Sequence, residues 1–146
     1  LEELQRVGEA AECYAQAIEA QRVACSRAPE VSRYRMFLSK HYYNYGRVLR
    51  RLGRPDEAAE AALARRTLWP QDPKHLFAVA QELAESTRLL AGAGRPGMNA
   101  ADCAVAALDT LRQAKAAGWK PGEGQAWTES FAALKGYPGF ESVVRN

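Results

Sequence analysis

The sequence predicts an all-α protein built from helical hairpins. Alanine-rich segments repeat their apolar residues at intervals of three and four, which is the period of a helix, and glycine or proline separates each segment from the next. No segment keeps the alternation of period two that a half-buried strand requires. The chain has 146 residues, enough for one core, and its 25% charged and 47% hydrophobic residues argue against disorder.

The first two helices are expected at about residues 1–27 and 31–52. In the first of them, Val7, Ala11 and Ile18 recur at helical spacing. Pro29 should end this helix, because proline lacks a backbone donor and disfavours helix at the residue before it. Gly53 should end the second helix.

Three further helices are expected at residues 54–68, 72–91 and 99–117. The first has proline at its opening position and acidic residues in its first turn, which suits the positive end of the helix dipole. Asp72 and Asn99 are predicted to cap the other two, since their side-chain oxygens can accept from free backbone amides.

The last segment, residues 119–146, is predicted to cap the helices before it. It should contain two short helices, one capped by Thr128 and one beginning at Pro138. It is too apolar for a free linker, with aromatic residues that include Trp119, Trp127 and Phe131. An open end of a helical array exposes core, so we expect this segment to fold back over that end.

A repeat runs through the middle of the chain. Tyr42-x-x-Tyr45-Gly46-x-x-Leu49, continued by Leu52-Gly53-Arg54-Pro55-Asp56-Glu57-Ala58 and Pro70, resembles the tetratricopeptide repeat (TPR) pattern. One step of 34 residues later, Leu76, Val79, Ala80 and Leu83 repeat it. The pattern has departures, with Ala62 where an aromatic residue is usual and Arg65 where a small one is usual.

The resemblance implies a helix-turn-helix repeat array over residues 1–118. The repeats would be a partial first at 1–28, a second at 31–70 and a third at 73–118, followed by the capping segment. Because the first repeat lacks its first helix and the chain begins at Leu1 rather than Met, we expect a fragment of a longer array.

A narrower resemblance concerns three blocks: Asp72-Pro73-Lys74-His75-Leu76-Phe77, the helix with Leu108-x-x-Leu111-Arg112-Gln113-Ala114, and Tyr137-Pro138-Gly139-Phe140-Glu141. Together they are similar to the C-terminal TPR arrays that follow the kinase domain in large bacterial eukaryotic-like serine/threonine kinases. This implies a scaffold region of a bacterial signalling protein. No kinase motif lies in the chain itself.

The charge is uneven, although the net value is only +3. Residues 31–70 carry nine bases against three acids, whereas residues 1–30 carry three bases against six acids. Such a local positive field favours an acidic partner. In TPR proteins the first-helix face lines a concave groove, and the resemblance places eight residues there: Lys40, Tyr43, Asn44, Arg47, Arg51, Lys74, Phe77 and Gln81.

The chain is therefore predicted to bind a peptide or partner protein of acidic character. Asn44 matches one position of the clamp with which some TPR proteins hold a C-terminal carboxylate. The clamp residues that the first repeat would contribute are missing from this sequence. The alternative reading of the basic face is that it is merely solvated.

Two other functions stay open. The array could be a structural spacer, or could form a homodimer through the N-terminal helix, whose apolar stripe lacks its neighbouring helix. A nucleic-acid-binding helical domain is less favoured, because the C-terminal half is neutral and no RNA-reading motif is present.

No enzyme, cofactor or metal site is predicted. His41 and His75 have no further donors at ligand spacing, and Gly92-x-Gly94-x-x-Gly97 lacks the strand that a nucleotide-binding fingerprint requires. Three cysteines without a CxxC pair argue against a disulfide framework, so we expect a reducing, cytoplasmic location. The apolar runs are too short for a membrane span.

Overall fold

The computed structural model describes residues 2–91, 98–122 and 127–145. Within these ranges the protein is all-helical and contains no strand, as the sequence predicts. The chain forms two compact units, Leu1–Leu68 and Trp69–Asn146. The first unit, called unit 1, and the second, called unit 2, are each described by themselves.

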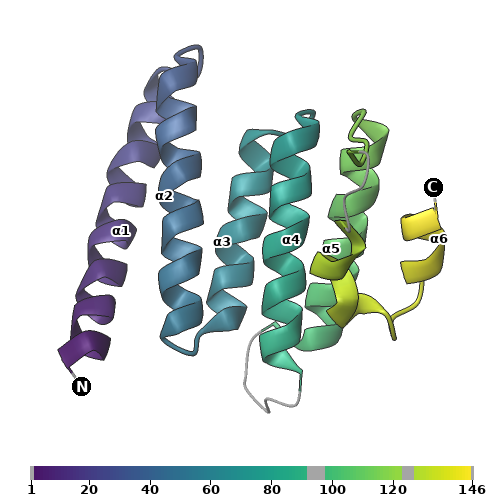
Figure 1. Cartoon of the computed structure of the whole chain (residues 1–146). Helices are drawn as coiled ribbons and strands as arrows, with labels where there is room; N and C mark the ends of the chain where they lie inside the picture. Colours follow the sequence, from purple (N-terminus) through teal and green to yellow (C-terminus); the bar gives the residue numbers. More distant parts are fainter. Residues whose placement is uncertain (1, 92–97, 123–126, 146) are drawn as a thin grey trace. The chain divides into compact units, whose positions relative to one another are not determined.

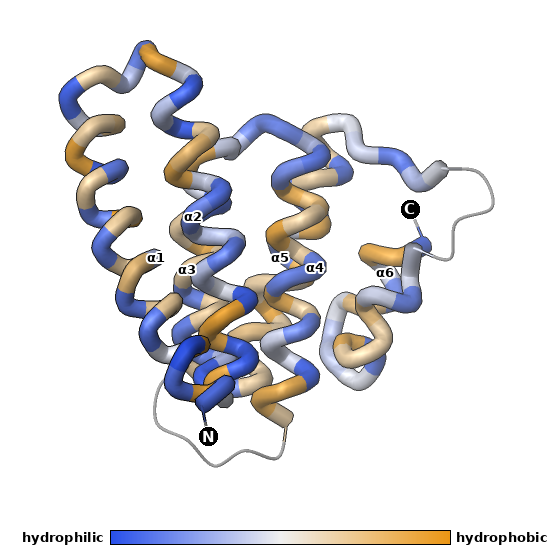
Figure 2. Tube along the Cα trace, turned by 60° about the vertical axis from the view of Figure 1, so that its left-hand side comes forward, coloured by the Kyte–Doolittle hydropathy of each residue, from blue (hydrophilic) through white to orange (hydrophobic). Residues whose placement is uncertain are grey.

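Unit 1 consists of three helices in succession, α1 (Glu2–Arg27), α2 (Ser32–Arg51) and α3 (Pro55–Leu68). Helix α1 packs on α2, and α2 packs on α3 (Figure 1). Hydrophilic and hydrophobic residues are interspersed along each helix (Figure 2). The core of unit 1 takes larger side chains from α1 and α2 and alanines from α3: Val7, Ala11, Ile18, Leu38, Leu49, Ala58, Ala59, Ala61 and Ala62.

Small residues let α2 and α3 approach closely. A Cβ atom added to Gly46 would lie 3.6 Å from Nη1 of Arg50 and 3.8 Å from the carbonyl oxygen of Ala58, so the α3 backbone lies at van der Waals distance from this position. Gly53 closes the turn between the two helices with φ at 73°, a left-handed conformation that costs other residues strain. The amide of Arg54 donates to the carbonyl oxygen of Leu49 at 2.9 Å, which ends α2 where the sequence predicts.

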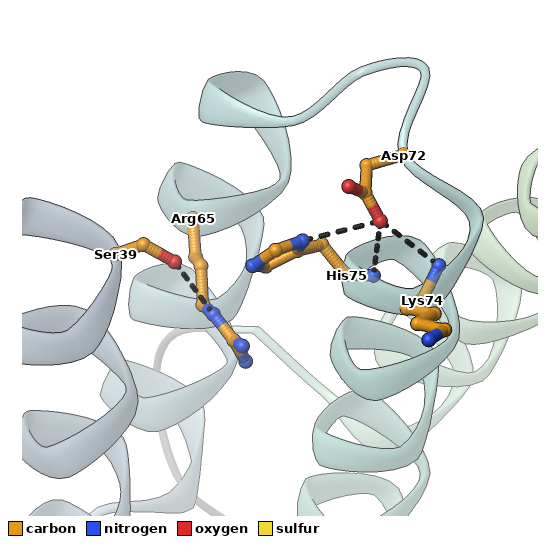
Figure 3. Close-up of polar contacts among 5 residues, drawn as sticks. All are labelled: Ser39, Arg65, Asp72, Lys74 and His75. Carbon is orange, nitrogen blue, oxygen red and sulfur yellow. Dashed lines mark hydrogen bonds and ion pairs between the residues drawn. The ribbon is translucent and has the colours of Figure 1, made fainter. Parts of the chain in front are cut away.

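Unit 2 is built on a hairpin of α4 (Pro73–Leu90) and α5 (Ala100–Ala116). The predicted caps are confirmed. The Asp72 carboxylate accepts from the amides of Lys74 and His75, both at 3.0 Å (Figure 3), and Asn99 accepts from the amide of Asp102 at 2.8 Å. The glycine motif at residues 92–97 lies outside the described residues.

The core of unit 2 is made of α4 and α5 side chains, among them Cys103, that are almost completely buried. The Cys103 thiol donates to the carbonyl oxygen of Leu83 at 3.1 Å, and burial raises the pKa of that thiol. Cys103 therefore behaves as a small core residue, as expected. The buried apolar side chains of the hairpin are Leu76, Val79, Ala80, Leu83, Ala84, Leu90, Cys103, Ala104, Ala107, Leu108, Leu111 and Ala114.

The C-terminal segment folds back on this hairpin. A 3₁₀ helix, η1 (Trp127–Leu134), packs on α4, and the short α6 (Phe140–Arg145) packs on α5. Phe131 and Leu134 are fully buried there. Two details of the sequence prediction were wrong. Thr128 lies inside η1 rather than capping it. The last helix begins at Phe140 rather than at Pro138, because residues 135–139 form turns and Gly139 has a left-handed φ of 92°.

The Asp72 cap yields a stability prediction. Replacing Asp72 with alanine should lower the free energy of unfolding of unit 2 by about 1 kcal/mol, because two amides lose their acceptor. Hydrogen bonds hold the pKa of the Asp72 carboxyl below its ordinary value, and the bond from the His75 amide contributes most. The cap therefore stabilises fully above the ordinary value, and its contribution is lost as the pH falls through the lowered one.

Urea titrations of the wild type and of Asp72→Ala at neutral and acidic pH measure this difference. Asp72→Asn is the control, because asparagine caps about as well as aspartate. An equal loss for both variants at neutral pH would contradict the cap interpretation.

Candidate functional site

The unit 1 members of the predicted groove lie together on the outer side of α2. This helix has 20 residues with six bases and no acid. Four of the predicted side chains are exposed and the fifth, Asn44, is half-buried. We name this surface the α2 surface; its residues are Lys40, Tyr43, Asn44, Arg47 and Arg51.

Two guanidinium groups lie close to the Tyr43 ring at the centre of the α2 surface. The ring is 39% exposed, and the Cζ atoms of Arg47 and Arg65 lie 5.9 Å and 5.2 Å from its centroid. These distances are within the range of cation–π attraction. Both cations are therefore held beside an exposed aromatic ring.

Arg65 reaches this position from α3. Its Nε donates to the hydroxyl of Ser39, 3.1 Å away, and Ser39 is buried at the base of the α2 surface (Figure 3). Sequence reasoning did not include Arg65 among the site residues and noted it only as a departure from the repeat pattern. A large cation at a position that usually holds a small residue was the signal that could have identified it.

Apolar side chains continue the α2 surface toward the N-terminus of α2. Met36 is 58% exposed and Phe37 is 46% exposed, and Met36 lies two helical turns before Tyr43. At the opposite end Arg51 forms an ion pair with Glu3 at 2.6 Å, with both side chains exposed. Such a pair contributes little to stability, so Arg51 remains available to an anionic ligand.

The unit 2 members of the predicted groove have a different environment. The Phe77 ring stacks on Trp119 with centroids 4.0 Å apart and meets Trp127 and Phe131 edge to face at 6.4 Å and 5.6 Å. The amide of Gln81 donates to the hydroxyl of Ser130 at 3.2 Å. Phe77 is therefore engaged by the protein's own C-terminal segment, rather than standing open as the apolar anchor expected from the sequence.

Lys74 is exposed on α4, but Phe77, one helical turn further on, contacts Trp127 and Phe131 of η1. Sequence reasoning treated the capping segment and the groove as separate features. In unit 2 they use the same side of α4, because the aromatic residues of the cap have Phe77 as their partner. The α2 surface is therefore the part of the predicted site that stands open within its own unit.

Both histidines are partly buried within their own units. His41 is half-buried, and the His75 ring stacks on Trp69 at 4.3 Å, with its Nδ1 atom 3.2 Å from the Asp72 carboxylate. Over the described residues, no group of three or more His, Cys, Asp or Glu side chains is arranged to hold a metal ion. In the same ranges every helix is too short or too polar to cross a bilayer.

Compared with protein-family models, curated proteins and solved structures, the chain gives no match.

The ring cluster around Phe77 leads to a prediction about the C-terminal segment. Phe77→Ala should lower the free energy of unfolding of unit 2 by about 2–3 kcal/mol, because three ring contacts and their apolar burial are lost together. All three tryptophans of the chain lie in unit 2, so tryptophan fluorescence during urea unfolding reports on this unit.

Val105→Ala is the control, since Val105 is 64% exposed and its truncation should change stability by less than about 0.5 kcal/mol. If both variants unfold at the urea concentration of the wild type, the C-terminal segment does not depend on Phe77.

Proposed function

We propose that the chain is a non-enzymatic protein–protein interaction module of tetratricopeptide type, which binds an acidic peptide segment on the α2 surface. Its resemblance to the repeat arrays of bacterial serine/threonine kinases supports a place in a larger signalling protein. The observation that carries the proposal is the exposed Tyr43 ring with the guanidinium groups of Arg47 and Arg65 both within 6 Å of its centroid.

The chemistry of this arrangement fits a carboxylate or phosphate. A guanidinium group presents a planar fork of donors that can bind two oxygens of such an anion at once. The ring of Tyr43 offers apolar area next to these donors, and Met36 and Phe37 extend that area along the helix. A peptide with alternating acidic and apolar residues would bind both the guanidinium groups and this apolar area.

Preorganisation supports binding on this surface. The inner side of α2 is buried through Leu38, Gly46 and Leu49, so the helix cannot rotate without exposing core. The Ser39 hydroxyl and the Tyr43 ring restrain Arg65 before any ligand arrives. Cations that are already placed lose less conformational entropy on binding than free ones do.

The test is binding of fluorescent acidic peptides, some ending in a free carboxylate and some phosphorylated, to the whole chain. Asn44→Ala/Arg47→Glu should weaken binding of the best peptide about tenfold or more, because one donor fork is replaced by a repelling charge. Circular dichroism establishes that the variant keeps its helical content.

Arg27→Glu is the matched control, with the same charge change on an exposed residue at the end of α1. If both variants weaken peptide binding equally, the loss comes from the change in net charge alone, which would contradict a specific site. Nucleic acid that displaces the peptide, with an affinity that falls steeply with salt, would favour the nucleic-acid alternative instead.

A further inference from the structure

Unit 1 has an open groove on the side of α2 that faces away from the α2 surface. Two adjoining hollows, with volumes of about 540 Å³ and 270 Å³, lie along α1 and share Ala15 and Tyr45. On a helix of 3.6 residues per turn, Tyr45 points about 160° away from Arg47. We name this feature the α1–α3 groove.

Small side chains form the walls of the α1–α3 groove. Gly8, Ala11 and Ala15 line it on α1, and Ala61 and Ala64 line it on α3. A Cβ atom added to Gly8 would meet nothing within 4 Å, so the wall is open at that point. Small residues on facing elements allow another helix to approach closely, at the 8–10 Å typical of helix packing.

The floor of the groove comes from α2. The half-buried rings of Tyr42 and Tyr45 lie there. They offer apolar ring area with a polar hydroxyl at the edge, a combination that suits the contact face of an amphipathic helix. A partner can therefore bury apolar side chains between α1 and α3 without displacing any part of unit 1.

Carboxylates form the rim. Glu9 and Glu12 line the groove on α1, and Glu57 and Glu60 line it on α3. The one cation in the lining, Arg54, donates its Nη2 to Glu57 at 2.6 Å. No ion pair within the described part of the chain engages Glu9, Glu12 or Glu60. The groove therefore carries an excess of negative charge on both edges.

From these features we infer that the α1–α3 groove binds a cationic amphipathic helix of a partner protein. From Gln5 to Ile18 the lining extends along α1 for about 20 Å, the length of about 13 helical residues. The apolar side of the guest lies on the tyrosines and alanines. Lysine or arginine side chains at its flanks reach the carboxylates on both edges, with their stems along the walls.

A second copy of this chain does not fit the groove in the same way. Its most basic helix is α2, but the apolar side of α2 is already buried between α1 and α3. That helix could offer only its charged side to another groove. Nucleic acid and anionic lipid are repelled by the rim. A partner helix with free apolar and basic faces satisfies both the floor and the edges.

The test uses a fluorescein-labelled model helix of about 14 residues, with leucine along one face and lysine on both flanks. A second peptide has glutamate in place of each lysine. Fluorescence anisotropy with the whole chain should show binding of the lysine peptide only. Binding of both peptides with equal affinity would overturn the charge argument.

Two kinds of variant locate the site. Glu12→Lys/Glu60→Lys should weaken binding of the lysine peptide about tenfold or more, while Glu30→Lys/Glu129→Lys makes the same charge change at exposed residues outside the groove and should weaken it far less. Ala15→Trp fills the groove without changing charge and should also abolish binding. Because Ala15 is exposed, this substitution leaves the core intact.

Several results would overturn the inference. Equal weakening by the two charge-reversed pairs, or full binding by Ala15→Trp, would show a diffuse electrostatic attraction with no groove. A dimer of the wild type in sedimentation experiments that Glu12→Lys/Glu60→Lys dissociates would assign the groove to a second copy. Arg47→Glu should leave binding of the lysine peptide unchanged, which separates this site from the proposed function.

Discussion

The packing of α2 between α1 and α3 is the constraint on which the rest of unit 1 depends. Leu38 and Leu49 are buried on one side of α2, and Gly46 allows α3 to approach on the same side. A helix with one side fixed in this way must direct its remaining residues outward. Four of the six bases of α2 are exposed, and three of them, Lys40, Arg47 and Arg51, belong to the α2 surface.

The same packing separates charge of opposite sign. Acidic residues of α1 and α3 line the α1–α3 groove, whereas Lys40, Arg47 and Arg51 face away from it. Opposite faces of one small unit thus carry charge of opposite sign, and the two proposed binding sites share no residue. Each face has an apolar element beside its charges, which limits a purely electrostatic and indiscriminate attraction.

In unit 2 the comparable side of the first hairpin helix is already occupied. Phe77 and Gln81 on α4 contact η1 and the tryptophans of the C-terminal segment. Apolar area on α4 that could have bound a ligand instead stabilises the fold of this unit. The aromatic residues of the cap are the reason, because buried rings contribute stability only when partner rings or apolar side chains cover them.

The sequence by itself determined the long helices and their ends, but not where the two short C-terminal helices begin. Apolar spacing predicted the five long helices of the described residues. Asp72, Asn99 and Gly53 marked ends that the structure places within one residue or so, because caps and turns depend on local chemistry. The cationic side of α2 was also readable, since helical spacing alone gathers Lys40, Tyr43 and Arg47. Only the tertiary structure decided the contacts between helices. Arg65 of α3 lies beside Tyr43 of α2, and Phe77 packs on rings of the C-terminal segment. Glu12 and Glu60 line the same groove from α1 and α3. These arrangements join residues far apart in the chain, which local periodicity cannot pair.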